Sequence, residues 1–244
     1  MAEQAIAEQK VENKERFGIE EMMGVGLHFG HKTSKTHPRM KPYITGVRNG
    51  IHIINLEKTR EKLTAALAAL ADLAAEGKVI LLVGTKVQVK DLVRELGKET
   101  GFPHVTNRWI GGLLTNFEKV EGRIAHLKDL DQKKKGEEFQ KYTKWEQHEM
   151  EEEIERLEAK FGGVKNLQKL PDAMFVFDLE KNQIALREAR QRGVKVFAIV
   201  DTDCDPASVD YAIPANNDAV SSLSYIIDKV RDTILAAKSR ATAQ

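Results

Sequence analysis

The sequence predicts an α/β fold, with a mainly parallel sheet covered by helices on both faces and a helical hairpin inserted into it. Two short and wholly apolar runs, at residues 79–83 and 173–177, are typical of strands that are buried on both sides. Helical patterns separate the expected strands, and this alternation favours parallel strands joined by crossover helices. Residues 118–160 interrupt the alternation with two amphipathic patterns and no strand.

The N-terminal part of the chain has little regular patterning. Residues 1–17 are polar and are expected to form a flexible extension, and a short helix is expected over 19–25. Residues 26–50 are rich in Gly, His, Pro and basic residues without a helical or strand period, which indicates a structured loop. A short strand at 52–56 is expected to open the alternating part of the chain.

The alternating part contains the helices and strands of the predicted sheet. Ala and Leu recur at helical spacing over 58–75, and Gly77 ends this helix. Thr85 and Gln88 fit a capping box that opens a helix reaching about Leu96. The remaining elements are expected as strands at 104–106, 173–177, 195–200 and 211–213, and as helices at about 184–191 and 218–238.

The interrupting segment is expected to form an antiparallel helical hairpin with a coiled-coil-like seam. Thr115 with Glu118 and Thr143 with Glu146 fit two capping boxes, one for each helix. Apolar residues follow each box at alternating spacings of three and four, which is the pattern of a coiled coil. The predicted seam residues are Phe117, Val120, Ile124 and Leu127 in the first helix and Met150, Ile154, Leu157 and Phe161 in the second.

Length and composition favour one large domain with an appendage. The chain has 244 residues, of which 41% are hydrophobic, and this is enough for a substantial core. We therefore expect a single discontinuous α/β domain over 18–115 and 164–240, with the helical hairpin inserted at 116–163.

The same numbers bear on the compartment. The single cysteine, Cys204, excludes an internal disulfide and favours a reducing environment. The first residues have neither a positive start nor an apolar run, so they do not resemble a secretory signal. No apolar stretch approaches the roughly 20 residues that span a bilayer. We expect a cytoplasmic protein without membrane contact.

Charge is distributed unevenly along the chain, although the net charge is only +1. Residues 22–62 contain eight Lys or Arg against two Glu, whereas 137–158 contain nine Glu against three basic residues. Such asymmetry is compatible with one face bound to a polyanion and another exposed to solvent. An ordinary solvated helix surface explains the acidic segment well and the basic segment less well.

Residues 105–117 combine an arginine, a tryptophan and a Gly-Gly pair within an apolar segment. Arg108 and Trp109 are suited to an RNA backbone or a stacked base. The alternative is a buried tryptophan that anchors a helix to the sheet, with Gly111 and Gly112 making the turn. Because the segment lies at the root of the predicted hairpin, we favour a packed Trp109, with Arg108 facing RNA or a neighbouring carboxylate.

Carboxylates and amides follow the predicted strands at the edge where parallel sheets bind ligands. Asp178 and the segment 201–205, which contains Asp201, Asp203 and Asp205, can hold a divalent cation or can cap turns and helices. A second candidate metal site consists of the histidines His28, His31, His37 and His52. An enzyme or small-ligand binder that uses this acidic cleft is the alternative function.

The sequence supports neither nucleotide binding nor catalysis by a cysteine thiol. The glycines Gly24 and Gly26 precede the first expected strand, so they do not form a dinucleotide-binding turn. Gly84, Thr85 and Lys86 lack the preceding glycine loop of a phosphate-binding loop. Cys204 has no recognisable catalytic partner. We expect no resident cofactor, with a divalent cation at His28 and His31 or at Asp201, Asp203 and Asp205 as the remaining possibility.

Five segments together resemble one family. Residues 26–33, 48–56, 107–117, 171–178 and 199–206 match, in this order, motifs of the bacterial S2 family of small-subunit ribosomal proteins. The resemblance implies a flavodoxin-like three-layer domain with an inserted helical hairpin. It also implies a structural, non-enzymatic constituent of the small ribosomal subunit. In the family, this protein binds ribosomal RNA between head and body and helps anchor the large mRNA-binding protein S1, without a homo-oligomer.

The chain departs from the family pattern at two internal places, and its N-terminal extension is longer than is typical of the family. Asn217 and Ser221 stand where the family commonly has Asp and Arg, so a basic contact at that helix start is not implied here. Val194-Lys195 replaces the usual Ile-Pro before a late strand.

The leading hypothesis is a ribosomal RNA-binding scaffold, and a third, weaker one is a protein adaptor whose hairpin binds a partner helix. Basic residues in the N-terminal part, at Arg108 and on the hairpin are the candidates for phosphate contact. The candidate RNA-binding residues are Lys32, Lys35, Arg39, Lys41, Arg48, Arg108, Lys119, Arg123, Lys133, Lys134 and Lys135.

Overall fold

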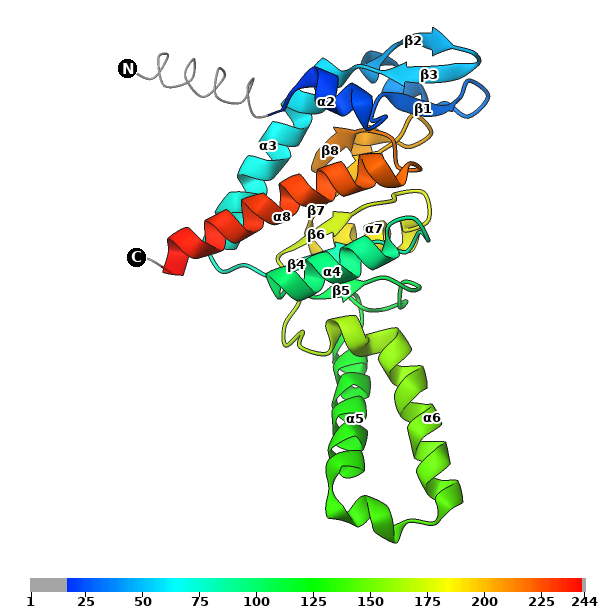
Figure 1. Ribbon diagram of the computed structural model, residues 1–244, viewed down its shortest axis with the longest axis vertical. Coiled ribbons are helices and arrows are strands. Elements are labelled where there is room, and N and C mark those ends of the chain that lie inside the picture. Colours follow the sequence, from blue (N-terminus) through cyan, green and yellow to red (C-terminus); the bar gives the residue numbers. More distant parts are fainter. Residues whose placement is uncertain (1–16, 243–244) are drawn as a thin grey trace.

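A five-stranded parallel sheet forms the centre of the molecule, as predicted (Figure 1). The computed structural model describes residues 17–242, apart from the side chains of Glu137, Glu138 and Thr242. Every pair of neighbouring strands in this sheet is parallel. In spatial order the strands are β5 (His104–Val105), β4 (Ile80–Val83), β6 (Ala173–Val176), β7 (Lys195–Val200) and β8 (Tyr211–Pro214).

The strands separate two hydrophobic cores. In β4, Ile80 and Leu82 belong to one core, and Leu81 and Val83 belong to the other. All four side chains are buried, which explains why the strand is a continuous apolar run rather than an alternating one. Each such side chain contributes roughly 1.5–3 kcal/mol through burial. The predicted parallel sheet with helices on both faces is therefore confirmed.

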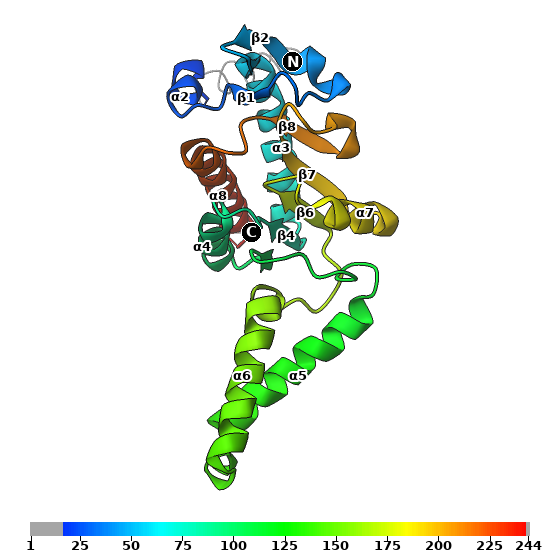
Figure 2. The ribbon, with the colours of Figure 1, turned by 90° about the vertical axis from the view of Figure 1, so that its right-hand side faces the viewer.

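Three helices cover one face of the sheet, and one helix covers the other (Figures 1 and 2). The first face packs against Leu63 of α3, Val93 of α4 and Ile226 of α8. The second face packs against Leu186 of α7. The bounds of these helices are Leu56–Ala75 for α3, Lys90–Thr100 for α4, Gln183–Arg192 for α7 and Val220–Thr242 for α8.

A second, antiparallel sheet lies at 26–50, where the sequence predicts a structured loop without strands. Its strand order is β1-β3-β2, and the short helix α2 precedes it. The loop prediction was wrong because these short strands are mostly exposed and carry register shifts, so they show no alternation of apolar and polar residues. The strand expected at 52–56 pairs in this small sheet and not in the parallel one. The elements are α2 (Ile19–Gly24), β1 (Phe29–Lys32), η1 (Pro38–Tyr43), β2 (Ile44–Arg48) and β3 (Ile51–Ile54).

Two helix starts differ from the prediction. Helix α3 begins two residues early because the Asn55 side chain accepts hydrogen bonds from the backbone N–H groups of Glu57 and Lys58. The capping box at Thr85 and Gln88 is absent. Helix α4 starts only at Lys90 without a side-chain cap, and the Thr85 hydroxyl donates to Asn182 instead.

Helices α5 (Phe117–Lys135) and α6 (Lys144–Phe161) project from the sheet and are joined by η2 (Glu137–Lys141) (Figure 1). They are inclined to each other in Figure 2. Their facing apolar side chains are buried in one shared cluster. The buried side chains are Val120, Ile124, Leu127 and Leu130 in α5 and Ile154, Leu157 and Phe161 in α6.

Only one of the two predicted capping boxes of this hairpin forms. The Thr143 N–H donates to the Glu146 carboxylate at 2.8 Å, and the Glu146 N–H donates back to the Thr143 hydroxyl at 3.4 Å. The box predicted at Thr115 and Glu118 is wrong. Helix α5 has no side-chain cap, because the Thr115 hydroxyl donates to Glu188 of α7.

The expected N-terminal extension lies outside the described residues, except for its last residue. Phe17 is buried in the core, and the Lys229 ammonium lies 5.8 Å from its ring centroid. Among the described residues, no helix combines the length and the apolar character needed to cross a membrane.

Candidate functional site

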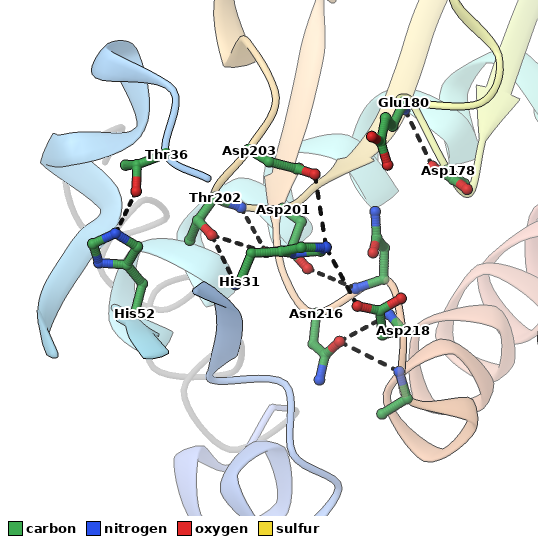
Figure 3. Close-up of polar contacts among 12 residues, drawn as sticks. His31, Thr36, His52, Asp178, Glu180, Asp201, Thr202, Asp203, Asn216 and Asp218 are labelled. Carbon is green, nitrogen blue, oxygen red and sulfur yellow. Dashed lines mark hydrogen bonds and ion pairs between the residues drawn. The ribbon is translucent and has the colours of Figure 1, made fainter. Parts of the chain in front are cut away.

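The turns after β7 and β8 bring three carboxylates to one place at the sheet edge. Asp201 and Asp203 follow β7, and Asp218 follows β8. Strand β1 of the small sheet adds His31 between them (Figure 3). The His31 Nδ1 atom lies 3.1 Å from Asp201, and its Nε2 atom lies 3.7 Å from Asp203 and 3.4 Å from Asp218. We call these four residues the strand-end cluster.

The backbone of β1 approaches the turn after β7 closely enough to place this histidine. The His31 N–H donates to the Thr202 hydroxyl at 2.9 Å. A Cβ at Gly30 would lie only 2.5 Å from the Thr202 methyl carbon. Glycine at position 30 is therefore required by the close contact between the two sheets.

The strand-end cluster carries a charged histidine. The close contact of the His31 ring with the accepting Asp201 carboxylate raises the pKa of His31 to about 9, against the effect of burial, and the charges of Asp201, Asp203 and Asp218 add to the increase. At neutral pH His31 is therefore protonated. Its ion pairs join the small sheet to the parallel sheet.

The same side chains have the composition of a divalent-cation site. Ligand atoms of His31, Asp201 and Asp203 lie within 4.8 Å of one another. Within residues 17–242, Oδ1 of Asp203 is buried without a hydrogen-bond partner. Imidazole and carboxylate are suitable ligands for a divalent cation, which would displace the proton of His31.

The structure thus joins His31, from one of the two cation regions that the sequence suggested, to Asp201 and Asp203 from the other. It leaves His28 and Asp205 outside the cluster. Burial lowers the pKa of His28, with a further contribution from the charge of Arg48, and His28 is not part of the cluster. Asp205 pairs with Arg39 at 2.7 Å and accepts from the Ala207 N–H to cap a short helix. Asp205 therefore has a structural role outside the cluster.

The protein's own side chains fill the edge where a ligand cleft was considered. Lys86 is buried, and its ammonium donates to the Asn217 carbonyl at 3.0 Å and to Asp218 at 2.6 Å. Asp178 accepts from the Glu180 N–H, as a turn-forming aspartate does (Figure 3). Burial raises the pKa of the Cys204 thiol far above neutrality, so this thiol is not a nucleophile.

The segment at the hairpin root is packed, as we favoured. Trp109 is 8% exposed, and its indole N–H donates to Glu188 at 3.0 Å. Arg108 next to it is exposed. The two neighbours therefore point to different environments, and Arg108 is the one available to a partner.

Glu188 is a residue that the sequence analysis missed. It lies in α7 between charged neighbours and has the pattern of a solvent-exposed glutamate, yet it is only 7% exposed. No local signal marks it, since its partners lie in the segment 109–115, more than seventy residues earlier.

All candidate RNA-binding residues lie at the surface. They form two groups at opposite ends of the molecule: the small sheet with η1, and the root and length of the hairpin (Figure 1). Some carry intramolecular ion pairs, such as Lys133 with Asp129 at 2.7 Å and Lys134 with Glu151 at 2.9 Å. The structure does not bring the two groups together. The first contains Lys32, Lys35, Arg39, Lys41 and Arg48, and the second contains Arg108, Lys119, Arg123, Lys133, Lys134 and Lys135.

Comparison with known proteins identifies the family to which the chain belongs. The sequence model described as "Ribosomal protein S2" matches residues 22–237 of the chain. The chain belongs to this family. Its members are structural, non-enzymatic constituents of the small ribosomal subunit, so the acidic-cleft enzyme is excluded.

Several bacterial relatives carry the same description, small ribosomal subunit protein uS2. The chain is 44% identical to the protein of Koribacter versatilis (strain Ellin345) over 216 residues, which is 88% of this chain and 72% of the relative. Identity to the protein of Chlorobaculum tepidum is 42% over 92% of this chain and 90% of the relative. Identity to the protein of Coprothermobacter proteolyticus is 43% over 89% of this chain and 81% of the relative.

Proposed function

We propose that this member of the S2 family binds small-subunit ribosomal RNA between the head and the body of the subunit. One observation carries the proposal: the candidate RNA-binding residues are all exposed, and they form two separate groups in an elongated molecule, one on the small sheet and η1 and the other along the hairpin (Figure 1). A protein with separated cationic regions can contact two RNA elements that are themselves far apart. The cytoplasm is the compartment that this role implies.

The small sheet supplies the first proposed contact. Lys32, Lys35 and Lys41 are exposed, and they lie on β1, on η1 and in the turn between them. Lysine and arginine bind phosphate oxygens without reading sequence, and they release counterions on binding. The strand-end cluster holds this sheet on the main domain, so it fixes the position of these cations.

The hairpin supplies the second proposed contact. Lys119 and Arg123 are four residues apart on α5, so they lie on one face of the helix. Arg108 is exposed near the root of the same helix. We propose that the buried apolar residues of α5 and α6 form a coiled-coil-like seam, which makes the hairpin a stiff support for these cations.

Two further parts of the proposal rest on family membership and not on geometry. The protein would help anchor the mRNA-binding protein S1, and it would act as a single copy in contact with neighbouring ribosomal proteins. The family match over residues 22–237 supports both.

Replacement of four cations in the small sheet and η1 tests the first contact. The variant Lys32→Ala, Lys35→Ala, Arg39→Ala, Lys41→Ala is expected to enter small subunits poorly in a sucrose-gradient assay. Its affinity for small-subunit RNA should also depend less steeply on salt, by roughly one unit of slope for each lost phosphate contact.

A matched control removes the same charge elsewhere on the exposed surface. The variant Lys98→Ala, Lys169→Ala, Lys181→Ala, Lys195→Ala should incorporate normally, since these exposed lysines belong to neither proposed contact. Equal incorporation of the two variants would remove the small sheet from the interface.

We propose a divalent cation at His31, Asp201 and Asp203 as a secondary property of the protein. The proximity of the three ligand atoms and the unpartnered buried oxygen of Asp203 support it. Such a cation would stabilise the contact between the small sheet and the parallel sheet.

A further inference from the structure

Backbone and side-chain donors of the segment 109–115 converge on one carboxylate. Oε1 of Glu188 accepts from the Trp109 indole N–H at 3.0 Å and from the Gly112 N–H at 2.8 Å. Oε2 accepts from the Leu114 N–H at 3.0 Å and from the N–H and hydroxyl of Thr115, both at 3.3 Å. The two oxygens therefore receive five hydrogen bonds. The left-handed backbone of Gly112, with φ +86°, allows the segment to wrap around the carboxylate.

The carboxylate is held in its ionised form. Burial by itself raises the pKa of Glu188, but the hydrogen bonds from Gly112, Trp109, Leu114 and Thr115 outweigh this effect and hold the pKa below its usual value. Backbone N–H groups that converge in this way form an anion-binding concavity. Here the anion belongs to the same chain.

These contacts connect α7 with the segment that leads into the hairpin, and both also contribute side chains to one hydrophobic cluster. Glu188 belongs to α7, which packs on the parallel sheet through Ala185, Leu186 and Ala189. Thr115 lies two residues before the start of α5. Arg192, one turn further along α7, donates to the Thr115 carbonyl. Helix α7 therefore holds the chain through hydrogen bonds at the point where the hairpin begins.

The other end of the hairpin has its own attachment. A Cβ at Gly163, just after α6, would lie 2.2 Å from the His104 carbonyl oxygen, so this glycine is pressed against β5. The Asn107 amide also donates to the Ala159 carbonyl at 2.5 Å. The hairpin is thus held at two supports: the hydrogen bonds to Glu188 before α5, and the Gly163 contact together with the Asn107–Ala159 hydrogen bond at the end of α6.

We propose that Glu188 is a positioning residue that sets the direction of the hairpin relative to the parallel sheet. If its carboxylate is lost, the α5 support loosens while the α6 support remains, and the hairpin pivots about Gly163. This consequence holds whether or not the hairpin contacts RNA, so it can be tested on the isolated protein.

The test measures hairpin direction as a distance distribution. Spin labels are attached at Ala68→Cys on α3 and Ala125→Cys on α5, both exposed positions, in a Cys204→Ala background that removes the buried native thiol. Double electron–electron resonance is expected to give one narrow distribution for the parent protein. Glu188→Gln replaces one acceptor oxygen by an amide N–H₂ group, which faces the N–H donors of the segment 109–115. The distance distribution should therefore broaden.

Amide exchange reports the same contact locally. In Glu188→Gln, the N–H groups of Gly112 and Leu114 should exchange roughly tenfold faster or more, as expected for lost bonds to a charged acceptor. Glu180→Gln, which removes the same charge from an exposed glutamate just before α7, should change neither measurement. Glu188→Asp keeps the charge and should restore part of the narrow distribution.

Two outcomes overturn the proposal. One is a narrow, unshifted distance distribution in folded Glu188→Gln, and the other is equal broadening in Glu180→Gln. If Glu188→Gln does not fold, the same distance measurement on Trp109→Phe tests the proposal. It removes one donor to the carboxylate while keeping an aromatic ring in the pocket, so it should broaden the distribution to a smaller extent. An unchanged distribution in Trp109→Phe would then refute the role of Glu188.

Discussion

Two charged side chains join segments that are far apart in the sequence. His31 contacts carboxylates that lie some 170 residues later, and Glu188 gathers donors from a segment more than seventy residues earlier. Buried or half-buried charges are costly unless ion pairs or hydrogen bonds compensate them. Three carboxylates compensate the charge of His31, and five hydrogen bonds compensate that of Glu188. At the scale of single residues, these two contacts join the small sheet to the parallel sheet and the hairpin root to α7.

The contribution of Glu188 to stability should depend on pH in a defined direction. Because its folded-state pKa lies below the ordinary value of 4.5, Glu188 stabilises the fold at pH values above 4.5. This contribution is lost as the pH falls through the folded-state pKa. We expect the difference in urea midpoint between the parent protein and Glu188→Gln to be constant near neutrality and to shrink in acid. A difference that grows in acid would contradict this assignment.

The strand-end cluster should respond to a divalent cation through His31. A cation that binds only the folded state raises stability by about 2.7 kcal/mol at a hundredfold excess over its Kd. We expect Zn²⁺ to raise the thermal midpoint of the parent protein but not that of His31→Gln. His126→Gln, an exposed histidine on α5, serves as the control and should respond like the parent. If Zn²⁺ shifts all three proteins equally, the cation acts elsewhere.

The elements divide into those that local patterning predicted and those that it did not. The strands of the parallel sheet were predicted within one or two residues because each is a short apolar run bounded by turns. Strands β1 and β2 of the small sheet were missed because most of their side chains are exposed or half-buried and their registers shift, so they show no alternation of apolar and polar residues. The boxes at Thr85 and Thr115 failed for a related reason: each hydroxyl bonds to a residue of or next to α7 instead of capping its own helix.

The contact between the small sheet and the parallel sheet can be tested with a pair of glycines. Gly30→Ala should destabilise the protein by about 1–3 kcal/mol, since its Cβ would lie 2.5 Å from Thr202. Gly46→Ala is the control in strand β2, where nothing lies within 4 Å of the new Cβ. It should be neutral or should stabilise by up to about 1 kcal/mol through the unfolded state. Urea unfolding measures both, and a neutral Gly30→Ala would refute the steric argument.

The whole molecule is elongated, with one basic region on the small sheet and η1 and another on the hairpin (Figure 1). A net charge of +1 hides this arrangement, because acidic side chains of α6 balance the basic ones in the total. Separation of the two regions along the long axis suits a protein that holds two RNA elements in fixed relation.

The separation of the two basic regions also predicts that they contribute independently to RNA affinity. Lys32→Ala with Lys41→Ala should weaken binding by one increment, and Lys119→Ala with Arg123→Ala by another. The combined variant should equal their sum within about 0.5 kcal/mol, because the sites share no partners. Filter binding to small-subunit RNA measures all three. Strong coupling would show that both regions contact one element or that the hairpin changes direction.

The sequence by itself determined the α/β fold, the strands of the parallel sheet, the apolar residues between α5 and α6, and the family. Apolar periodicity is a local property, and five ordered motifs are specific without coordinates. Only the tertiary structure decided that His31 meets Asp201 and Asp203, that Glu188 holds the hairpin root, and that the basic residues form two groups and not one. These relations depend on the path of the chain between distant positions. No local pattern of residues encodes that path, because the partners become neighbours only after the sheets and helices have packed.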